Sequence, residues 1–233
     1  NGKYYYMNAA GTVTKNSWIG SYYLGNDGAM LTNTYTPDGY YVGLDGLWTP
    51  AKWIQSGNKW WYRHSDGSYT TNDFEEIGNQ RYYFDSNGLM QRGMIPLNGK
   101  IYLFGADGAM QYGFYSDPTA GTRYFKTDGS MAANELLTVG TNKYYFNTNG
   151  VMATGLTNIG GVTYLFGADG AMQYGWYTDA SGMRYFQTNG AMVVNTTLAV
   201  GGVTYVFDAN GLATAVPVIN PATWVTDPAT GVT

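Results

Sequence analysis

Cysteine is absent from the 233-residue sequence, and charged residues are scarce at 12%. The absence of cysteine excludes a disulfide framework, thiol chemistry and thiolate metal ligation. Twelve basic residues against sixteen acidic residues give a net charge of −4, so the sequence lacks the basic surface that binds nucleic acid or an anionic membrane. No apolar run approaches the roughly 20 residues of a membrane-spanning helix. The sequence therefore favours neither nucleic-acid binding nor membrane insertion.

Aromatic residues and glycine are abundant instead. The chain holds 23 Tyr, 7 Trp, 9 Phe and 33 Gly, whereas runs of the helix-favouring residues Glu, Lys and Leu are scarce. This composition favours many short β-strands joined by tight turns. We therefore expect an all-β fold.

An internal repeat is marked by a glycine that follows each aromatic run. Asp or Asn precedes this glycine in ten of eleven units, which is the strongest local signal for a β-hairpin. Each unit is therefore interpreted as one β-hairpin, with its aromatic strand directly before the Asp-Gly or Asn-Gly turn. From Gly46 onward the spacing is 20 or 21 residues, and the marker glycines are Gly11, Gly28, Gly46, Gly67, Gly88, Gly108, Gly129, Gly150, Gly170, Gly190 and Gly211.

Hairpins of this size must bury their apolar faces against one another, because a lone hairpin is marginally stable in water. Met stands two positions after the glycine in seven units and is expected to fill the core beside the aromatic rings. The sequence thus predicts an elongated β-solenoid of about eleven stacked hairpins over residues 1–213. Residues 214–233 break the pattern with three prolines and are predicted to form a terminal cap strand and a linker or tail.

A longer period of 61 or 62 residues relates every third hairpin. It is clearest in two near-copies, Gly105–Asp117 and Gly167–Asp179, which share Gly-Ala-Asp-Gly-Ala-Met-Gln-Tyr-Gly followed by two aromatics. A divergent third member is expected 62 residues upstream of the first copy, where Tyr115 maps onto Trp53 and Tyr124 onto Tyr62. That region holds the densest group of tryptophans, Trp48, Trp53, Trp60 and Trp61.

The repeated form Gly-x-x-Tyr-Tyr-Phe-x-x-x-Gly-x-Met resembles the bacterial cell-wall-binding and glucan-binding repeat family. The segment Gly140–Met152 matches it almost position by position, and the resemblance covers residues 1 to about 213. This family includes choline-binding modules of pneumococcal surface proteins, glucan-binding repeats of glucansucrases and C-terminal repeats of clostridial toxins. The resemblance implies a left-handed β-solenoid, secreted to the cell surface of a Gram-positive bacterium and attached to an enzyme, toxin or adhesin, with ligand sites between successive hairpins.

Two ligand classes remain open within that resemblance. Choline recognition, carried over from the family, needs three aromatics at fixed spacing, and only Trp53, Trp60 and the following Tyr83 meet it. Two other units carry Arg81 or Lys143 in place of Trp60, and such a positive charge would repel a quaternary ammonium. The glucan-binding and toxin branches instead place sugar sites where Met-Gln-x-Gly-aromatic precedes a Tyr-Phe strand. This pattern occurs in both near-copies, so the sugar-binding branch fits better.

The candidate sugar-binding residues combine flat rings, which stack on the apolar face of a pyranose, with amide and guanidinium groups for its hydroxyls. The alternative is that Phe114 and Trp176 belong to the core and the arginines only stack on neighbouring tyrosines. Trp53 and Trp60 form either a sugar platform or a choline cage. The candidates are Gln111, Tyr112, Phe114, Tyr115, Arg123 and Tyr124 in the first copy, Gln173, Tyr174, Trp176, Tyr177, Arg184 and Tyr185 in the second, and Trp53 and Trp60 in the third.

No catalytic constellation stands out in the sequence. His64, the only histidine, lies beside an Asp-Gly turn and is interpreted as a surface turn residue, and no carboxylates pair as acid and base. The Asp-Gly turns lack the pattern of calcium-binding repeats, so neither a metal nor a cofactor is expected. The sequence predicts a non-catalytic module that tethers its parent protein to polysaccharide, an α-glucan or related glycan, with a choline or teichoic-acid anchor or a structural stalk as alternatives.

Overall fold

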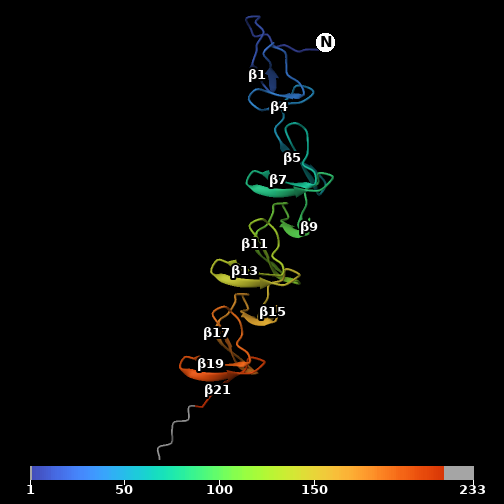
Figure 1. The fold of residues 1–233 in the computed structure, drawn as a ribbon. Coiled ribbons are helices and arrows are strands. Elements are labelled where there is room, and N and C mark those ends of the chain that lie inside the picture. Colours follow the sequence, from blue (N-terminus) through green and yellow to red (C-terminus); the bar gives the residue numbers. More distant parts are fainter. Residues whose placement is uncertain (1, 218–233) are drawn as a thin grey trace, which may run out of the picture. The chain divides into compact units, whose positions relative to one another are not determined.

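The computed structural model describes residues 2–217, and within them it contains β-strands and no helix. The predicted all-β fold of repeated hairpins is confirmed, because the 21 strands of this range form nine two-stranded sheets and one three-stranded sheet (Figure 1). The chain divides into two compact units, residues 1–113 with 125–131 and residues 114–124 with 132–233. No helix long and apolar enough to cross a membrane occurs among the described residues.

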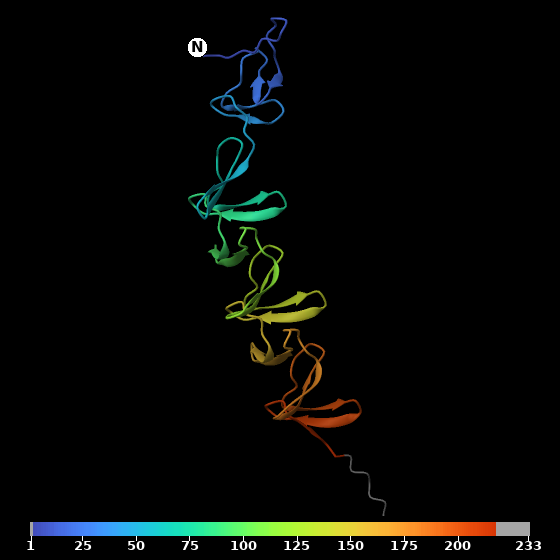
Figure 2. The ribbon, with the colours of Figure 1, turned by 180° about the vertical axis from the view of Figure 1, so that it is seen from behind.

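Every pairing joins strands that are consecutive in the sequence, as the separate ribbons of Figures 1 and 2 show. The first five hairpins are β1 (Ser17–Ile19) with β2 (Tyr22–Leu24), β3 (Thr34–Tyr35) with β4 (Tyr41–Val42), β5 (Lys52–Ser56) with β6 (Lys59–Arg63), β7 (Asp73–Ile77) with β8 (Gln80–Phe84), and β9 (Gly93–Leu97) with β10 (Lys100–Phe104). The other five are β11 (Gly113–Asp117) with β12 (Gly121–Phe125), β13 (Glu135–Val139) with β14 (Asn142–Phe146), β15 (Gly155–Ile159) with β16 (Val162–Phe166), β17 (Gly175–Asp179) with β18 (Gly182–Phe186), and β19 (Thr196–Val200) with β20 (Val203–Phe207) and β21 (Ala213–Ala215).

The turns that join the paired strands are not the Asp-Gly and Asn-Gly turns at the marker glycines, where the sequence suggested them. Strand β9 is joined to β10 by Asn98 and Gly99, whose φ angles are 49° and 77°. Two consecutive residues with positive φ give the two-residue turn whose twist matches that of a hairpin. The first unit, around Gly11, shows only a bridge between Met7 and Val13 and no paired strands.

The Asp-Gly and Asn-Gly turns at the marker glycines lie instead after the second strand of each hairpin. In one of them Gly88 donates its N–H to the carbonyl oxygen of Asp85 at 2.9 Å, and a bridge joins Phe84 to Met90. Among these turn residues only Gly88 has a positive φ, 71°, so the turn is of the kind that ends on glycine. The expectation failed because Asp-Gly and Asn-Gly are compatible with both kinds of turn.

From β8 onward the core is built from one phenylalanine per repeat at the end of the second strand, whereas β2 and β4 end in Leu24 and Val42 and β6 ends in Arg63. Period two along a strand turns these rings to one face and their neighbours to the other. None of the rings is more than 2% exposed: Phe84, Phe104, Phe125, Phe146, Phe166, Phe186 and Phe207.

Methionine connects each repeat to the next, and the expected core position is confirmed for Met172, which is 5% exposed. A Cβ atom on Gly190 would lie 2.3 Å from the Sδ atom of Met172, so the marker glycine of one repeat provides the space for the methionine of the previous one. The backbone N–H of Met172 also donates to the carbonyl oxygen of Lys143 at 2.8 Å. The repeats of each unit are therefore joined by backbone hydrogen bonds as well as by side-chain packing.

The predicted cap region begins with an ordered strand. Strand β21 pairs antiparallel with β20, with Val206 opposite Thr214. The rest of the predicted cap and tail, from residue 218 onward, lies outside the described residues. The boundary at residue 213 remains a prediction.

Candidate functional site

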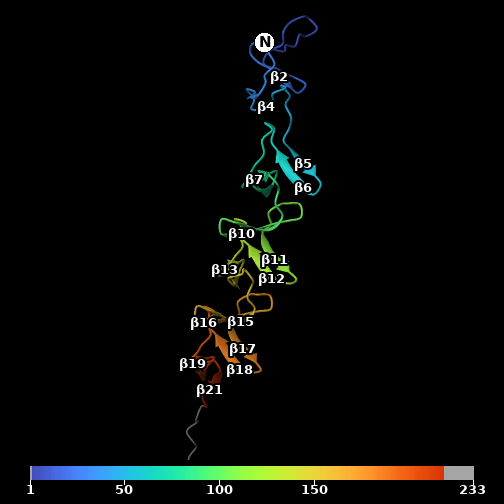
Figure 3. The same ribbon diagram turned by 90° about the vertical axis from the view of Figure 1, so that its right-hand side faces the viewer.

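One aromatic arrangement recurs at Trp53, Phe74, Phe114 and Trp176, on strands β5, β7, β11 and β17. The ring of Trp176 lies edge-on between a tyrosine of its own hairpin, Tyr185, at a centroid distance of 5.0 Å, and a tyrosine of the next hairpin, Tyr205, at 4.7 Å. Strands β17 and β18, which carry Trp176 and Tyr185, lie side by side in Figure 3. Each such site is thus built from two consecutive hairpins.

The other members have the same construction, and Phe74 lies 5.1 Å from Tyr83 and 5.2 Å from Tyr102. Phe114 lies 4.8 Å from Tyr124 and 5.1 Å from Tyr144, again edge-on. Trp53 lies 5.2 Å from Tyr62 and 4.9 Å from Tyr82. The divergent third member expected near Trp53 is therefore present in the fold.

The mapping of Tyr115 onto Trp53 was wrong by one residue, because Phe114 holds the position of Trp53. Three residues, 118–120, separate β11 from β12, whereas two residues separate β5 from β6 and β17 from β18. The additional residue lies in the turn, so an alignment that is correct for Tyr124 and Tyr62 is shifted on the preceding strand.

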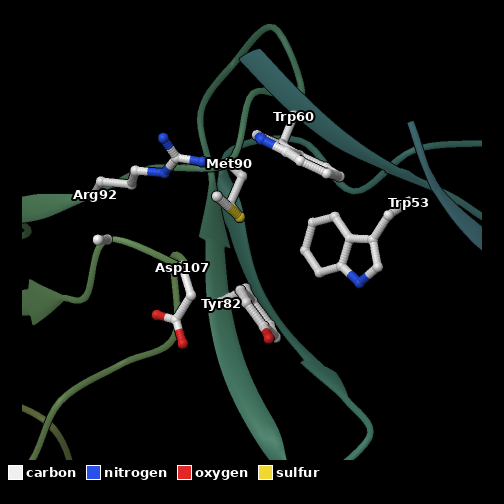
Figure 4. A pocket seen from close by; sticks show the side chains of 7 residues that line it. Trp53, Trp60, Tyr82, Met90, Arg92 and Asp107 are labelled. Carbon is white, nitrogen blue, oxygen red and sulfur yellow. The ribbon is translucent and has the colours of Figure 1, made fainter. Parts of the chain in front are cut away.

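Trp53 and Trp60 line a cavity of about 390 Å³ together with Tyr82, Met90, Arg92, Ala106 and Asp107. Their ring centroids are 6.2 Å apart and the rings are nearly perpendicular. In Figure 4 the rings of Trp53, Trp60 and Tyr82 surround one side, while Arg92 and Asp107 lie on the other. The side chains thus form an aromatic recess with one basic and one acidic group at its rim.

The third ring of this recess is Tyr82, not the expected Tyr83. Adjacent strand residues face opposite sides, so Tyr83 turns inward, where it is 8% exposed and packs against Phe74 at 5.1 Å. Burial, followed by the negative charge of Asp107, raises the pKa of Tyr82. Tyr82 therefore stays a neutral phenol that can donate a hydrogen bond to a ligand.

In the second near-copy the polar side chains are largely engaged within the protein. The side-chain amide of Gln173 donates to the carbonyl oxygen of Ala171 at 3.0 Å. Tyr174 is 48% exposed and Trp176 is 38% exposed, so these rings reach solvent. Tyr177 packs edge-on against Phe186 at 6.5 Å.

Arg184 is buried rather than presented to a sugar. It is 8% exposed, and its Nη1 donates to Asp179 Oδ2 at 2.8 Å while its Nε donates to the carbonyl oxygen of Asn210 at 3.3 Å. The backbone N–H of Ser181 and then the Arg184 guanidinium lower the pKa of Asp179. The arginine links hairpin β17–β18 to the following repeat, which corrects the expectation of an open fork of donors.

The aromatic side chains of the first near-copy are more exposed to solvent than those of the second. Phe114 and Tyr115 are 46% and 38% exposed, and Tyr112 is 50% exposed. Gln111 donates its side-chain amide to the carbonyl oxygen of Ala109 at 2.9 Å, as Gln173 does in its own copy. The Nη1 atom of Arg123 is buried, lies 3.8 Å from the Asp117 carboxylate and makes no hydrogen bond within the described chain. Its pairing is looser than that of Arg184.

The sequence reasoning missed a second recess, which is lined by Trp18, Tyr40 and Trp48. The three rings are mutually edge-on at centroid distances of 5.8, 6.3 and 5.6 Å around a cavity of about 380 Å³. Asp38 accepts the indole N–H of Trp18 at 2.8 Å, and hydrogen bonds from Thr36 and Trp18 lower its pKa. The available signal was Trp48, which occupies the position that Met holds in seven other repeats.

His64 lies in a hydrogen-bonded turn. Its Nδ1 is 2.7 Å from the hydroxyl of Ser68 and its Nε2 is 2.9 Å from a carboxylate oxygen of Glu75. Among the described residues there is no group of three His, Cys, Asp or Glu side chains that could hold a metal ion.

Known repeat families match four segments of this chain. Residues 12–48 and 153–196 match families described as choline-binding repeats, and residues 72–90 and 134–152 match a family described as a cell wall binding repeat. The chain belongs to the choline-binding and cell-wall-binding repeat family. The matched segments include Trp18 and Trp48 of the second recess and Trp176, whereas Trp53 and Trp60 lie outside them.

Individual relatives of this repeat family come from streptococci. The chain is 33% identical over 108 residues to glucosyltransferase-S of Streptococcus mutans and 32% identical over 96 residues to glucosyltransferase-I of Streptococcus downei. These alignments cover 45% and 41% of the chain but only 7% and 6% of the relatives. Choline binding protein F from Streptococcus pneumoniae has the same fold, with a TM-score of 0.63 at 24% identity over 83% of this chain and 74% of that one.

Proposed function

We propose that this chain is a non-catalytic module that tethers a secreted or cell-surface protein of a Gram-positive bacterium to a polysaccharide, an α-glucan or a related cell-wall glycan. The observation that carries the proposal is the aromatic ring held edge-on between two tyrosines, which recurs at Trp53, Phe114 and Trp176. Similar sites repeated along one chain suit a ligand that is itself a repeating polymer.

The chemistry of the rings suits sugars. Edge-on tyrosines fix each ring and leave part of it open, since Phe114 is 46% and Trp176 is 38% exposed. A fixed, half-open ring can stack on the apolar face of a pyranose without losing conformational entropy. One such site is expected to bind with a Kd on the order of mM to tens of μM. Several sites on one polymer raise the avidity by a factor of roughly 10² or more.

The relatives support a glycan ligand. Two of them are named glucosyltransferases, and they align with this chain over its repeats. The sequence also resembles glucan-binding repeats of such enzymes. A tethering module would hold an attached enzyme close to its polymer.

Affinity electrophoresis on gels containing dextran, starch or cell-wall polysaccharide tests the proposal. We expect retardation by at least one polymer, reduced in Trp176→Ala and further reduced when Phe114→Ala is added. Trp176→Phe is the matched control, because the first near-copy carries Phe at this position, and it should retain most of the retardation. A folded protein that is retarded by none of the three polymers contradicts the proposed function.

A quaternary ammonium such as choline is the second candidate ligand, favoured by the recess of Trp53, Trp60 and Tyr82. Rings on several sides attract such a cation, and Asp107 adds a negative charge, whereas Arg92 opposes it. Choline titration followed by tryptophan fluorescence separates this candidate from the first. Choline binding predicts a saturable change that is lost in Trp60→Ala, and a flat titration removes this candidate.

A further inference from the structure

His64 lies at the centre of a hydrogen-bonded cluster that joins two consecutive hairpins. It stands in the connector after β6, together with Ser68 and Thr70, whereas Glu75 belongs to β7 of the next hairpin. The Nδ1 atom of His64 is 2.7 Å from the Ser68 hydroxyl, and its Nε2 is 2.9 Å from Glu75 Oε1. The His64 ring therefore bridges the connector and the following hairpin.

The two hydroxyl groups of this cluster already donate to carboxylates. Ser68 Oγ donates to Asp66 Oδ1 at 2.6 Å, and Thr70 Oγ1 donates to Glu75 Oε2 at 2.6 Å. The hydroxyl and then the backbone N–H of Ser68 lower the pKa of Asp66, which keeps this carboxylate an anionic acceptor. Because a hydroxyl has one hydrogen to donate, Ser68 must accept from the His64 ring.

With a neutral His64 ring the cluster is one hydrogen short. A neutral imidazole carries a hydrogen on one nitrogen only, yet Nδ1 faces the Ser68 oxygen, which must accept, and Nε2 faces a carboxylate oxygen. The ring and the two hydroxyls then supply three hydrogens for four contacts. One additional proton makes both ring nitrogens donors and completes all four contacts.

The charges beside the ring favour this additional proton. The Glu75 side chain is only 19% exposed and faces Nε2, and the Asp66 carboxylate lies on the far side of the Ser68 hydroxyl. The neighbouring cation is Arg63, which precedes the ring in the chain and whose Nη2 points toward Gly67. Two carboxylates thus oppose one guanidinium. An unperturbed imidazole titrates at about pH 6.5, so proton uptake by such a cluster acts in the neutral range.

The cluster contacts both walls of the Trp53 recess. The His64 ring lies 5.9 Å from the ring of Tyr62, which itself lies 5.2 Å from Trp53. Glu75 is the cross-strand partner of Tyr82, the third ring of the recess in Figure 4. The contact between His64 and Glu75 therefore links the hairpin that carries Trp53 to the hairpin that carries Tyr82.

We propose that the folded chain takes up a proton at His64, and that this proton holds hairpins β5–β6 and β7–β8 in the arrangement that forms the recess of Trp53, Trp60 and Tyr82. Loss of the proton leaves one contact of the cluster without a hydrogen. Because the folded state then binds the proton more tightly than the unfolded state, the stabilisation is present near about pH 6 and is lost as the pH rises toward about pH 8. The inference rests on the proposed function only for the ligand that enters the recess.

The protonation of His64 can be observed directly, because the only histidine of the chain gives one imidazole in a ¹H–¹⁵N multiple-bond spectrum. We expect both ring nitrogens to stay protonated to a higher pH in the wild type than in Glu75→Gln, which removes the facing charge and keeps the shape. Glu76→Gln is the matched control, since Glu76 is the next residue of β7, is 66% exposed and pairs with Arg81. It should leave the titration of the ring unchanged. Identical titration in the wild type and Glu75→Gln overturns the inference.

Ser68→Ala tests the hydrogen count without changing any charge. It removes the oxygen that obliges Nδ1 to donate, so a neutral ring with its hydrogen on Nε2 satisfies Glu75. We expect the ring of this variant to lose its proton at a lower pH than the wild-type ring. A ring that titrates as in the wild type shows that the cluster is not one hydrogen short, which also overturns the inference.

The indole N–H signals of Trp53 and Trp60 then report the recess itself and separate the inference from the proposed function. We expect these signals to move between about pH 6 and about pH 8 in the wild type and in Glu76→Gln, and to move several-fold less in Glu75→Gln. If they move in this way but no polymer retards the protein, the tethering function fails and the inference stands. If a polymer retards the protein but the signals move equally in Glu75→Gln, the inference fails and the proposed function stands.

Discussion

The contact between Met172 and Gly190 gives a sharp test of how consecutive repeats stabilise one another. A Cβ atom on Gly190 would lie 2.3 Å from the Met172 Sδ and 3.2 Å from the Tyr164 Cδ1. Non-bonded heavy atoms do not approach to 2.3 Å, so Gly190→Ala must displace the methionine, which is only 5% exposed. We therefore expect Gly190→Ala to lower the free energy of unfolding of the second unit.

The size of the effect follows from two contributions. An alanine in the left-handed region, here at a φ of 88°, costs roughly 1–2 kcal/mol. Overpacking of the buried methionine adds roughly 1–3 kcal/mol. Gly175 is the matched control, because its φ is 80° but a Cβ there has no atom within 4 Å. Gly175→Ala should therefore show the backbone contribution alone.

Urea unfolding followed by near-ultraviolet circular dichroism measures these free energies. Gly190→Ala should be more destabilising than Gly175→Ala by roughly 1–3 kcal/mol. Met172→Ala should itself cost roughly 2–5 kcal/mol. In the double variant the alanine at 190 no longer meets the methionine, so the combined loss should fall short of the sum by about 1 kcal/mol or more. Equal destabilisation by the two glycine variants would refute the reasoning.

Two further predictions concern charged side chains. Arg184→Ala should lower the melting temperature by several degrees more than Arg123→Ala, because Arg184 has two hydrogen-bonded partners whereas the Arg123 Nη1 has none in the described chain; thermal unfolding of both variants checks this. The pKa of Asp128 is lowered from 3.8 to about 2, chiefly by the hydroxyl and then the backbone N–H of Ser130. A lowered folded-state pKa stabilises above about pH 4, and this contribution is lost as the pH falls toward 2. Asp128→Asn should therefore reduce the drop in melting temperature between pH 5 and pH 2, and an unchanged drop would contradict this assignment.

The repeat itself was predictable because its signals are local and periodic. The spacing of the marker glycines predicted the number of units to within the irregular first one, and the methionine two positions later predicted the packing between repeats. The position of the connecting turns was not predictable in the same way. Asn98-Gly99 and Asn87-Gly88 are the same dipeptide, yet only the first has both φ angles positive. The packing around the dipeptide decides which turn forms.

The recurrence of the aromatic sites every third hairpin was predictable from the sequence, but the hydrogen bonds of their side chains were not. The two near-copies pointed to Phe114 and Trp176, and both rings recur in one arrangement. The burial of Arg184 could not be read from its own repeat, because one of its partners, the carbonyl of Asn210, belongs to the next repeat. The recess of Trp18, Tyr40 and Trp48 was missed because its rings come from two irregular hairpins.

The difference between Arg81 and Trp60 explains why open recesses do not occur in every repeat. Both residues hold the second position of the second strand, on β8 and β6. The guanidinium of Arg81 lies 4.6 Å from the centroid of the Phe74 ring, which is the counterpart of Trp53. A cation of the protein therefore already covers that ring, whereas Trp60 leaves a cavity beside Trp53. The two hairpins have strands of the same length and the same register, although the β5–β6 repeat has Arg63 and Tyr69 where the β7–β8 repeat has Phe84 and Met90, so this position can differ without altering the hairpin. The choice at that position then decides whether a repeat covers its own aromatic ring or leaves it open to a ligand.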